Sequence, residues 1–241
     1  MNKLFFSIVI PCYNSEKSIS TVIDQIIKEN RSLEDFELKE IICVNDYSQD
    51  NTQDVILNLK KKNKFVTLVS NKKNLGQVGS TIEGIKVASS DYIVTLDDDG
   101  QHPPSEIVKL LKKCSRGNHD FVSGYWKNDE TRIRNISSII ANFLISVSIF
   151  KSPKFRLTAF RVINKSIKSQ IINKFHKSLI MDLRKITKNF STLQVNHNSN
   201  PLNRKFSNFL FRFKITFLYL IKETFFLIIF FAINVFLLFF I

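Results

Sequence analysis

Several familiar signatures are missing from this 241-residue chain, and each absence argues against a class of protein. It has no GxxxxGK[ST] segment, which excludes a P-loop nucleotide hydrolase, and no GxGxxG follows its first apolar run, which argues against a dinucleotide enzyme. Its four histidines lack zinc-ligand spacing with one another or with the cysteines. The three cysteines, Cys12, Cys43 and Cys114, are far apart in apolar surroundings, and no signal-peptide pattern opens the chain. We therefore expect a reduced, cytoplasmic domain.

Acidic residues are nearly absent from the second half of the chain. Residues 1–130 hold 17 Lys+Arg and 19 Asp+Glu, for a net charge of −2, whereas residues 131–241 hold 18 and 2, for +16. The two parts should therefore meet different partners. A strongly basic part suits either nucleic acid or an anionic membrane surface.

The end of the chain favours a membrane, rather than nucleic acid, as the partner of the basic half. Residues 224–241 read TFFLIIFFAINVFLLFFI, without a charge, and as a helix at ~1.5 Å per residue they cover roughly 27 Å, near the hydrocarbon thickness of a bilayer. A buried core helix is the alternative, but 12 of the 23 phenylalanines fall after Leu202. Among the basic residues before this run the interleaved residues are phenylalanines, which favours lipid over nucleic acid. We expect a basic amphipathic segment over residues 204–223, a single transmembrane helix over 224–241, and the N-terminal body on the cytoplasmic side of the inner membrane.

Short apolar runs alternate with amphipathic ones over the first 125 residues. FFSIVIP, LKEIICVN, KFVTLVS and DYIVTLD are typical of strands, and the segments between them carry apolar residues at helical spacing. This order predicts an α/β fold with a mainly parallel sheet covered by helices. Ligands are then expected at the carboxyl ends of the strands.

Three carboxylates follow the fourth of these strands, in LDDDGQHPP. Adjacent like charges gain nothing locally, so an external group should neutralise them. Asp97, Asp99 and the amide oxygen of Gln101 alternate in direction and offer hard oxygen ligands suited to Mg²⁺ or Mn²⁺, whereas Asp98 points the other way. A solvated turn is the alternative; the position at the end of a buried strand favours the metal.

A polar stripe marks a predicted helix in the basic half. In IRNISSIIANFLISV, Arg134, Ser138 and Asn142 recur every four residues opposite an apolar face. Such a stripe is either the solvent-exposed face of a helix or a binding surface. Basic residues without an intervening acid follow it and could donate to a phosphate: Lys151, Lys154, Arg156 and Arg161.

Six segments, in this order and spacing, resemble family 2 glycosyltransferases of the polyprenyl-phosphate type: SIVIPCYNSEKSI, ICVNDYSQDNT, NKKNLGQVGSTIEGIKVASSDYIVTLDDDGQHPP, FVSGYWKN, IRNISSIIANFLI and FRLTAFRV. That group includes dolichyl-phosphate mannose synthases and undecaprenyl-phosphate sugar transferases. The resemblance covers roughly residues 4–165. It implies a GT-A fold over residues 1–203, with a donor half about 1–125 and an acceptor half about 126–203. It also implies a UDP- or GDP-sugar donor, Mg²⁺ or Mn²⁺, and a lipid phosphate acceptor.

The resemblance also assigns roles to individual residues. On the donor side it implies nucleotide contacts from Pro11, Tyr13, Glu16, Asp46, Asn74, Gly76, Asp97 and Asp98, and metal ligation by Asp97, Asp99 and Gln101. On the acceptor side Arg134, Ser138 and Arg156 match positions that face the phosphate, and charge adds Arg204 and Lys205 as phosphate or headgroup contacts. The sequence departs from the family at Asn45, where many members have Asp, at Gly100, where Leu is usual, and in NPLNRKFS, a poor copy of a basic segment.

The expected chemistry is an inverting transfer that feeds cell-surface glycan synthesis. A lipid phosphate with a second pKa of ~6 is largely ionised at neutral pH, so no protein base is needed to make it attack the anomeric carbon. The absence of a Gln-x-x-Arg-Trp motif, expected of processive polysaccharide synthases, agrees with this. One alternative is transfer onto a hydroxyl of a lipid-linked saccharide with Asp182 as base. Another is a non-catalytic, membrane-tethered protein that binds a nucleotide sugar or a polyanion.

Overall fold

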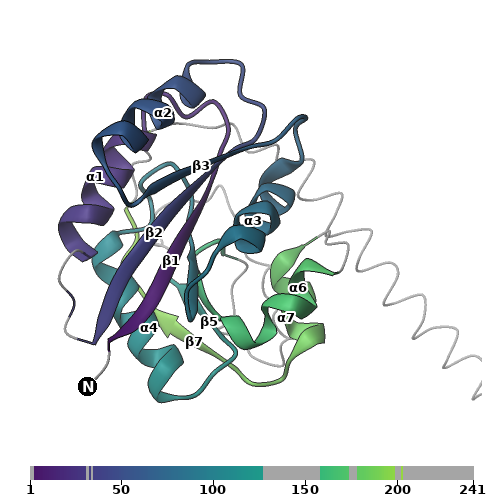
Figure 1. Cartoon of the computed structure of the whole chain (residues 1–241). Helices are drawn as coiled ribbons and strands as arrows, with labels where there is room; N and C mark the ends of the chain where they lie inside the picture. Colours follow the sequence, from purple (N-terminus) through teal and green to yellow (C-terminus); the bar gives the residue numbers. More distant parts are fainter. Residues whose placement is uncertain are drawn as a thin grey trace, which may run out of the picture. The chain divides into compact units, whose positions relative to one another are not determined.

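The centre of the fold is a seven-stranded sheet, seen in a computed structural model that describes residues 3–30, 33, 35–126, 158–173, 178–198 and 202. The strand order is β3-β2-β1-β4-β6-β5-β7 (Figure 1). The strands are β1 (Leu4–Cys12), β2 (Phe36–Asn45), β3 (Val66–Ser70), β4 (Tyr92–Thr95), β5 (Phe121–Tyr125), β6 (Arg161–Asn164) and β7 (Phe190–Gln194). Only β6 runs against its neighbours β4 and β5. The prediction of a mainly parallel sheet is confirmed.

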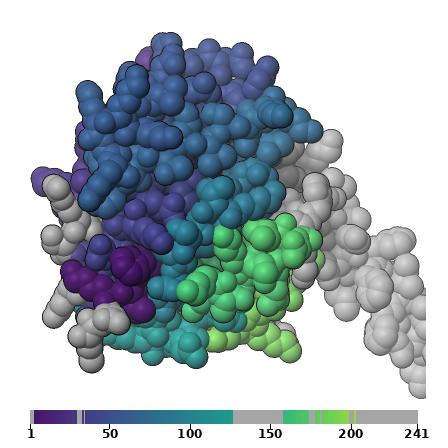
Figure 2. All heavy atoms as spheres, viewed as in Figure 1, coloured from purple at the N-terminus to yellow at the C-terminus, as the bar shows by residue number. Residues whose placement is uncertain are grey.

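Helices cover both faces of this sheet. On one side lie α1 (Ile19–Asn30), α2 (Thr52–Lys62) and α4 (Ile107–Arg116), the last preceded by the short η1 (Pro104–Glu106); on the other lie α3 (Gly76–Val87), α6 (Lys168–Ile172) with η3 (Lys165–Ile167) before it, and α7 (Leu179–Ile186) (Figure 1). In the space-filling view the green atoms of α6 and α7 lie beside the blue-teal atoms of α3 (Figure 2). The sheet is therefore the middle of three layers.

The central strands are buried on both sides, which explains their nearly unbroken apolar sequences. In β1 the side chains from Ile8 to Ile10 have no exposed surface. Helix α3 approaches this strand so closely that a Cβ atom on Gly84 would lie 2.3 Å from Cγ1 of Val9. A glycine is therefore required where α3 crosses the sheet.

The predicted C-terminal elements are not part of this description. No helix among the described residues is both long and apolar enough to cross a bilayer. The predicted interfacial segment, residues 204–223, and the predicted span, residues 224–241, lie outside the described residues.

Candidate active site

The carboxyl ends of three neighbouring parallel strands form the candidate site. Cys12 at the end of β1 pairs with Asn45 at the end of β2, and Val9 of β1 pairs with Thr95 at the end of β4. The loops that follow, residues 13–18, 46–51 and 96–103, consequently meet at one edge of the sheet. These are the loops in which the sequence predicted the ligands.

Asp98 joins the first and third of these loops. The residue is 4% exposed, and its carboxylate accepts hydrogen bonds from the Ser15 hydroxyl and, at 3.4 Å, from the backbone N–H of Tyr13. It therefore points into the protein toward the β1 loop. The sequence predicted that Asp98 points away from Asp97 and Asp99, but it did not predict the contact with Ser15; the nucleotide contact assigned to Asp98 stays a prediction.

The first loop is also tied to the second. The Asn14 N–H donates to Ser48 Oγ at 3.1 Å, and the Ser15 N–H donates to Thr52 Oγ1 at 2.6 Å. Glu16, predicted to contact the nucleoside, accepts from the backbone and side-chain nitrogens of Asn51, both at 3.0 Å. The two loops thus form one connected surface. Pro11 is the penultimate residue of β1, and Tyr13, directly after the strand, is 40% exposed.

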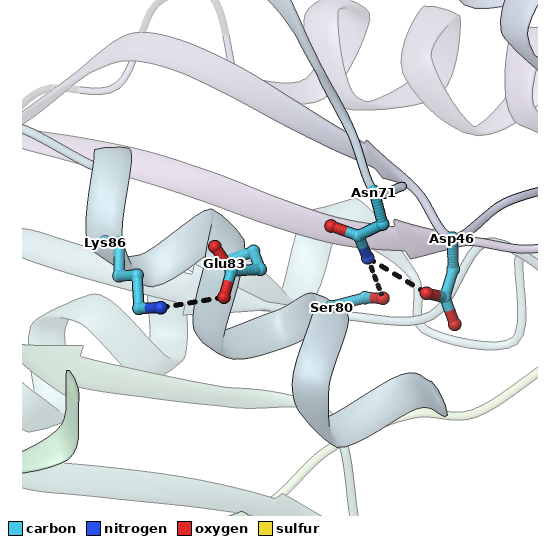
Figure 3. Close-up of polar contacts among 5 residues, drawn as sticks. All are labelled: Asp46, Asn71, Ser80, Glu83 and Lys86. Atoms are coloured by element: carbon cyan, nitrogen blue, oxygen red, sulfur yellow. Dashed lines mark hydrogen bonds and ion pairs between the residues drawn. The ribbon is translucent and has the colours of Figure 1, made fainter. Parts of the chain in front are cut away.

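Asp46, the first residue of the second loop, is buried, with 3% of its surface exposed. Its Oδ1 atom accepts a hydrogen bond from Asn71 Nδ2 at 2.9 Å (Figure 3) and a second from the Leu75 N–H at 2.8 Å. The Asn74 amide donates to the Asp46 carbonyl at 3.3 Å. These contacts connect the segment before α3 to the end of β2. Asn71 was not predicted, because nothing local in NKKN indicates a partner 25 residues away.

Helix α3 begins beside the three consecutive carboxylates of Asp97, Asp98 and Asp99. Gly76 has φ +72°, a conformation that favours glycine, and its N–H donates to Asn74 Oδ1 at 3.0 Å. The next residue, Gln77, donates from Nε2 to Oδ1 of Asp97. The start of α3 therefore connects the predicted donor residues Asn74 and Gly76, through Gln77, to Asp97.

Asp99 and Gln101 are held by the chain that follows β7. The Leu202 N–H donates to the Asp99 carbonyl at 2.7 Å, and Gln101 exchanges bonds with Asn198, which also donates to the Gly100 carbonyl at 2.9 Å. Gly100 has φ +74°, and a Cβ atom there would lie 2.8 Å from Cδ1 of Leu202. The departure from the usual Leu at position 100 thus suits both the backbone conformation and this contact.

His102 also holds this loop through a hydrogen bond to its backbone. Its Nδ1 accepts the Asp97 N–H at 3.1 Å, and its ring stacks on Phe160 with centroids 5.1 Å apart. Burial is the main reason that the pKa of His102 falls to about 4. The ring is neutral at physiological pH and fixes the backbone of the first carboxylate.

A buried arginine lies near these three consecutive carboxylates. Arg161 is 7% exposed and follows directly after the loop that contains Thr158, to whose carbonyl it donates. Its Nε and Nη1 atoms have no hydrogen-bond partner among the residues that the structure describes, and burial lowers its pKa to about 10, opposed by the charge of Asp97. It remains a cation and offsets part of the negative charge of the loop.

The loop after β4 offers oxygen donors of the type that a divalent cation binds. Burial, together with the charges of Asp97 and Asp98, raises the pKa of Asp99, and a bound cation would relieve that repulsion. No group of three or more His, Cys, Asp or Glu side chains arranged to hold a metal occurs within the described ranges. The predicted set of Asp97, Asp99 and Gln101 accordingly depends on an amide oxygen as its third ligand.

The predicted acceptor contacts cannot be placed beside this site. Arg134, Ser138, Arg156, Arg204 and Lys205 all lie outside the described residues, so their grouping around a phosphate stays a prediction.

Comparison with known proteins gives a consistent result. Residues 7–232 match the family described as glycosyl transferase family 2. An undecaprenyl-phosphate 4-deoxy-4-formamido-L-arabinose transferase from Proteus mirabilis is 31% identical over 149 residues, which are 61% of this chain and 44% of that protein. A poly(ribitol-phosphate) beta-glucosyltransferase from Bacillus spizizenii is 39% identical over 122 residues, which are 50% of this chain and 19% of that protein. The chain thus spans less than half the length of either relative.

Solved structures share the fold. Glucosyl-3-phosphoglycerate synthase from Mycobacterium tuberculosis, in complex with Mn²⁺, uridine diphosphate and phosphoglyceric acid, superposes with a TM-score of 0.60 at 17% identity, covering 83% of this chain and 72% of that one. S. aureus TarS 1-349 gives a TM-score of 0.57 at 18% identity, over 80% of this chain and 59% of that one. The expected GT-A arrangement is confirmed at the level of the fold.

Proposed function

The chain belongs to glycosyl transferase family 2, and from this membership we propose that it transfers a sugar from a nucleotide sugar to a polyprenyl phosphate. The reaction is metal-dependent, inverts the anomeric carbon and takes place at the cytoplasmic face of a membrane. The observation that carries the proposal is the continuous likeness to undecaprenyl-phosphate sugar transferases. This likeness is supported by the three connected loops at the carboxyl ends of β1, β2 and β4.

Donor binding is assigned to the described half of the site. The loops after β1 and β2 hold the nucleoside, with Tyr13 at the rim and the buried Asp46 at the centre. Asp97, Asp99 and Gln101 would hold a divalent metal, which when bound stabilises the charge that develops on the leaving nucleotide diphosphate. The bond from the Asp97 N–H to His102 and the bond from Ser15 to Asp98 hold the loop that carries these oxygens before substrate arrives, and such preorganisation is the main electrostatic contribution of an enzyme.

The acceptor supplies its own nucleophile. A lipid phosphate is largely ionised at neutral pH, so its oxygen attacks without a protein base. Only Asp182 and Glu223 follow Glu130 as carboxylates. Arg134, Ser138 and Arg156 are proposed to orient the phosphate, and the basic segment with Arg204 and Lys205 to contact it or neighbouring headgroups at the membrane.

A second function is favoured by one specific likeness. The 39% identical relative is named for transfer to poly(ribitol-phosphate), which is not a polyprenyl phosphate. A hydroxyl acceptor needs a general base, and Asp182 in the first turn of α7 is the carboxylate proposed for it. Transfer onto a glycan, but not onto bare polyprenyl phosphate, would favour this alternative.

The test uses membranes that contain the full chain. They are incubated with a panel of labelled nucleotide sugars, with Mn²⁺ or Mg²⁺ and added undecaprenyl phosphate, and the lipid is then extracted. We expect label from one nucleotide sugar in the lipid fraction, released by mild acid. Label confined to a saccharide would support the hydroxyl acceptor, and no transfer from any donor would refute both.

A further inference from the structure

One face of the sheet changes from apolar to polar at the last step before the candidate site. It is the face covered by α3, because Gly84 of α3 lies against Val9, which pairs with Thr95. On this face the register aligns four apolar side chains across β4, β6, β5 and β7: Ile93, Ile163, Phe121 and Phe190. The next row, toward the ends of β4, β5 and β7, is polar and consists of Thr95, Arg161, Ser123 and Thr192. Polar side chains inside a layered fold need hydrogen-bond partners, so this polar row calls for an account of where its bonds go.

Two side chains of the polar row have buried atoms without a partner. Thr95 Oγ1 donates to the Ala159 carbonyl at 2.5 Å, and Arg161 donates from Nη2 to the Thr158 carbonyl. Among the residues that the structure describes, Nε and Nη1 of Arg161 and Oγ of Ser123 make no hydrogen bond, although Arg161 is 7% exposed and Ser123 is 1% exposed. A buried polar group without a partner is costly, because it has lost its bonds to water. The polar row therefore lacks a partner that a ligand can supply.

The place of the polar row in the sheet indicates which part of a substrate reaches it. Thr95 ends β4 and is followed by the loop that carries the predicted metal ligands. Burial lowers the pKa of Arg161 and the charge of Asp97 opposes this, which puts the guanidinium near that carboxylate. In the strand order, β6 and β5 follow β4 on the side away from β1 and β2, whose loops are proposed to hold the nucleoside. A donor with its nucleoside at β1 and β2 and its diphosphate at β4 would therefore direct its sugar toward the polar row.

Charge and hydrogen-bonding capacity decide which chemical group the polar row accepts. The carboxylates of Asp97, Asp98 and Asp99 carry three negative charges, which a divalent cation and the guanidinium together balance. The guanidinium therefore needs no further anion, and its unpaired N–H groups suit a neutral oxygen. A sugar hydroxyl accepts from a guanidinium and donates to a serine hydroxyl at the same time. We infer that Arg161 and Ser123 bind a hydroxyl group of the sugar that is transferred; this rests on the proposed function. Arg161 is thereby separated from the basic residues that the sequence grouped with it as phosphate donors.

The test compares a nucleotide sugar with the same nucleotide without its sugar. The panel of nucleotide sugars, together with UDP and GDP, is titrated into the full chain in detergent by calorimetry, with Mn²⁺ present. Ser123→Ala should weaken binding of the nucleotide sugar by about three- to tenfold, the value of one neutral hydrogen bond. Arg161→Lys keeps the positive charge near Asp97 but removes Nε and Nη1, and should weaken it by at least about tenfold. Both variants should bind the free nucleoside diphosphate as the parent does.

Ser191→Ala is the matched control for the loss of a hydroxyl. Ser191 directly precedes Thr192 in β7, so its side chain points to the other face of the sheet. This variant should bind the nucleotide sugar and the diphosphate as the parent does. Thermal unfolding without ligand gives a second readout. Because Ser123 Oγ has no partner to lose, Ser123→Ala should melt at or above the parent temperature.

The outcomes separate this inference from the proposed function. If the parent binds neither a nucleotide sugar nor a nucleoside diphosphate, the proposed function fails. If the parent binds them but Ser123→Ala leaves nucleotide-sugar affinity unchanged, a buried water is the partner of the polar row and the inference is overturned. Equal losses for the nucleotide sugar and the diphosphate would assign the row to phosphate and also overturn it, as would a lowered melting temperature of Ser123→Ala. Should Arg161→Lys not fold, Ser123→Ala decides alone.

Discussion

Replacing Asp98 should destabilise the protein, whereas neutralising its neighbour Asp99 should not. Asp98→Ala removes a buried carboxylate that accepts from the Ser15 hydroxyl and the Tyr13 N–H, and leaves both donors without that acceptor. Each hydrogen bond to a charged group is worth ~1.5–3 kcal/mol, but the long 3.4 Å bond from Tyr13 belongs at the weak end. The expected cost is about 2–4 kcal/mol, which corresponds to roughly 4–16 °C in Tm for a domain of this size.

Asp99→Asn is the matched control in the same loop. The pKa of Asp99 is raised, chiefly by burial, so its ionised form is unfavourable in the folded metal-free protein, and this cost grows as pH rises above the unfolded value of 3.8. An uncharged amide avoids that cost, so the variant should melt at or above the parent temperature at pH 7. Thermal unfolding of the full chain in detergent measures both. A parent-like Tm for Asp98→Ala, or a large loss for Asp99→Asn, would refute this division of roles.

Three further predictions concern other parts of the molecule. The pKa of His102 is about 4 in the folded protein and 6.5 in the unfolded chain, so the free energy of unfolding should fall as pH drops below 6.5, by about 2 kcal/mol between pH 7 and 5. In chemical denaturation, His102→Asn should reduce this dependence of stability on pH. An unchanged dependence would contradict the assignment of the effect to His102. Gly84→Ala should lower the free energy of unfolding by ~1–3 kcal/mol, since its Cβ would lie 2.3 Å from Val9 Cγ1, and a parent-like value would mean that α3 shifts freely. Arg134→Ala and Arg156→Ala should bind the nucleotide sugar as the parent does but transfer to polyprenyl phosphate far more slowly, a loss of up to about 10²-fold each; lost donor affinity would assign these arginines to the nucleotide site.

The strands of the first half could be predicted because their signal is local. The run FFSIVIP is apolar on both faces, and β1 is buried on both faces of the sheet. The antiparallel direction of β6 had no such signal. It depends on a connection of more than thirty residues between β5 and β6, and no local pattern encodes the direction in which such a connection returns.

The site residues could be predicted by type, but their partners could not. The sequence indicated that Asp98 points away from Asp97 and Asp99, yet its partner Ser15 is 83 positions away. The donors to Asp46 are likewise 25 and 29 residues distant. Contacts of this kind come from the register of parallel strands, which sequence periodicity leaves undetermined.

The central claim is metal-dependent transfer to a lipid phosphate, and one measurement tests it directly. Full-length protein is placed in liposomes that contain undecaprenyl phosphate, and labelled sugar is followed from the nucleotide into the extracted lipid. We expect EDTA to abolish the transfer and Mn²⁺ to restore it. Asp99→Asn should lower the transfer rate on the order of 10²-fold without lowering the melting temperature of the protein. Lipid labelling that persists in EDTA and in Asp99→Asn would contradict the metal site, and a labelled saccharide with unlabelled lipid would contradict the acceptor.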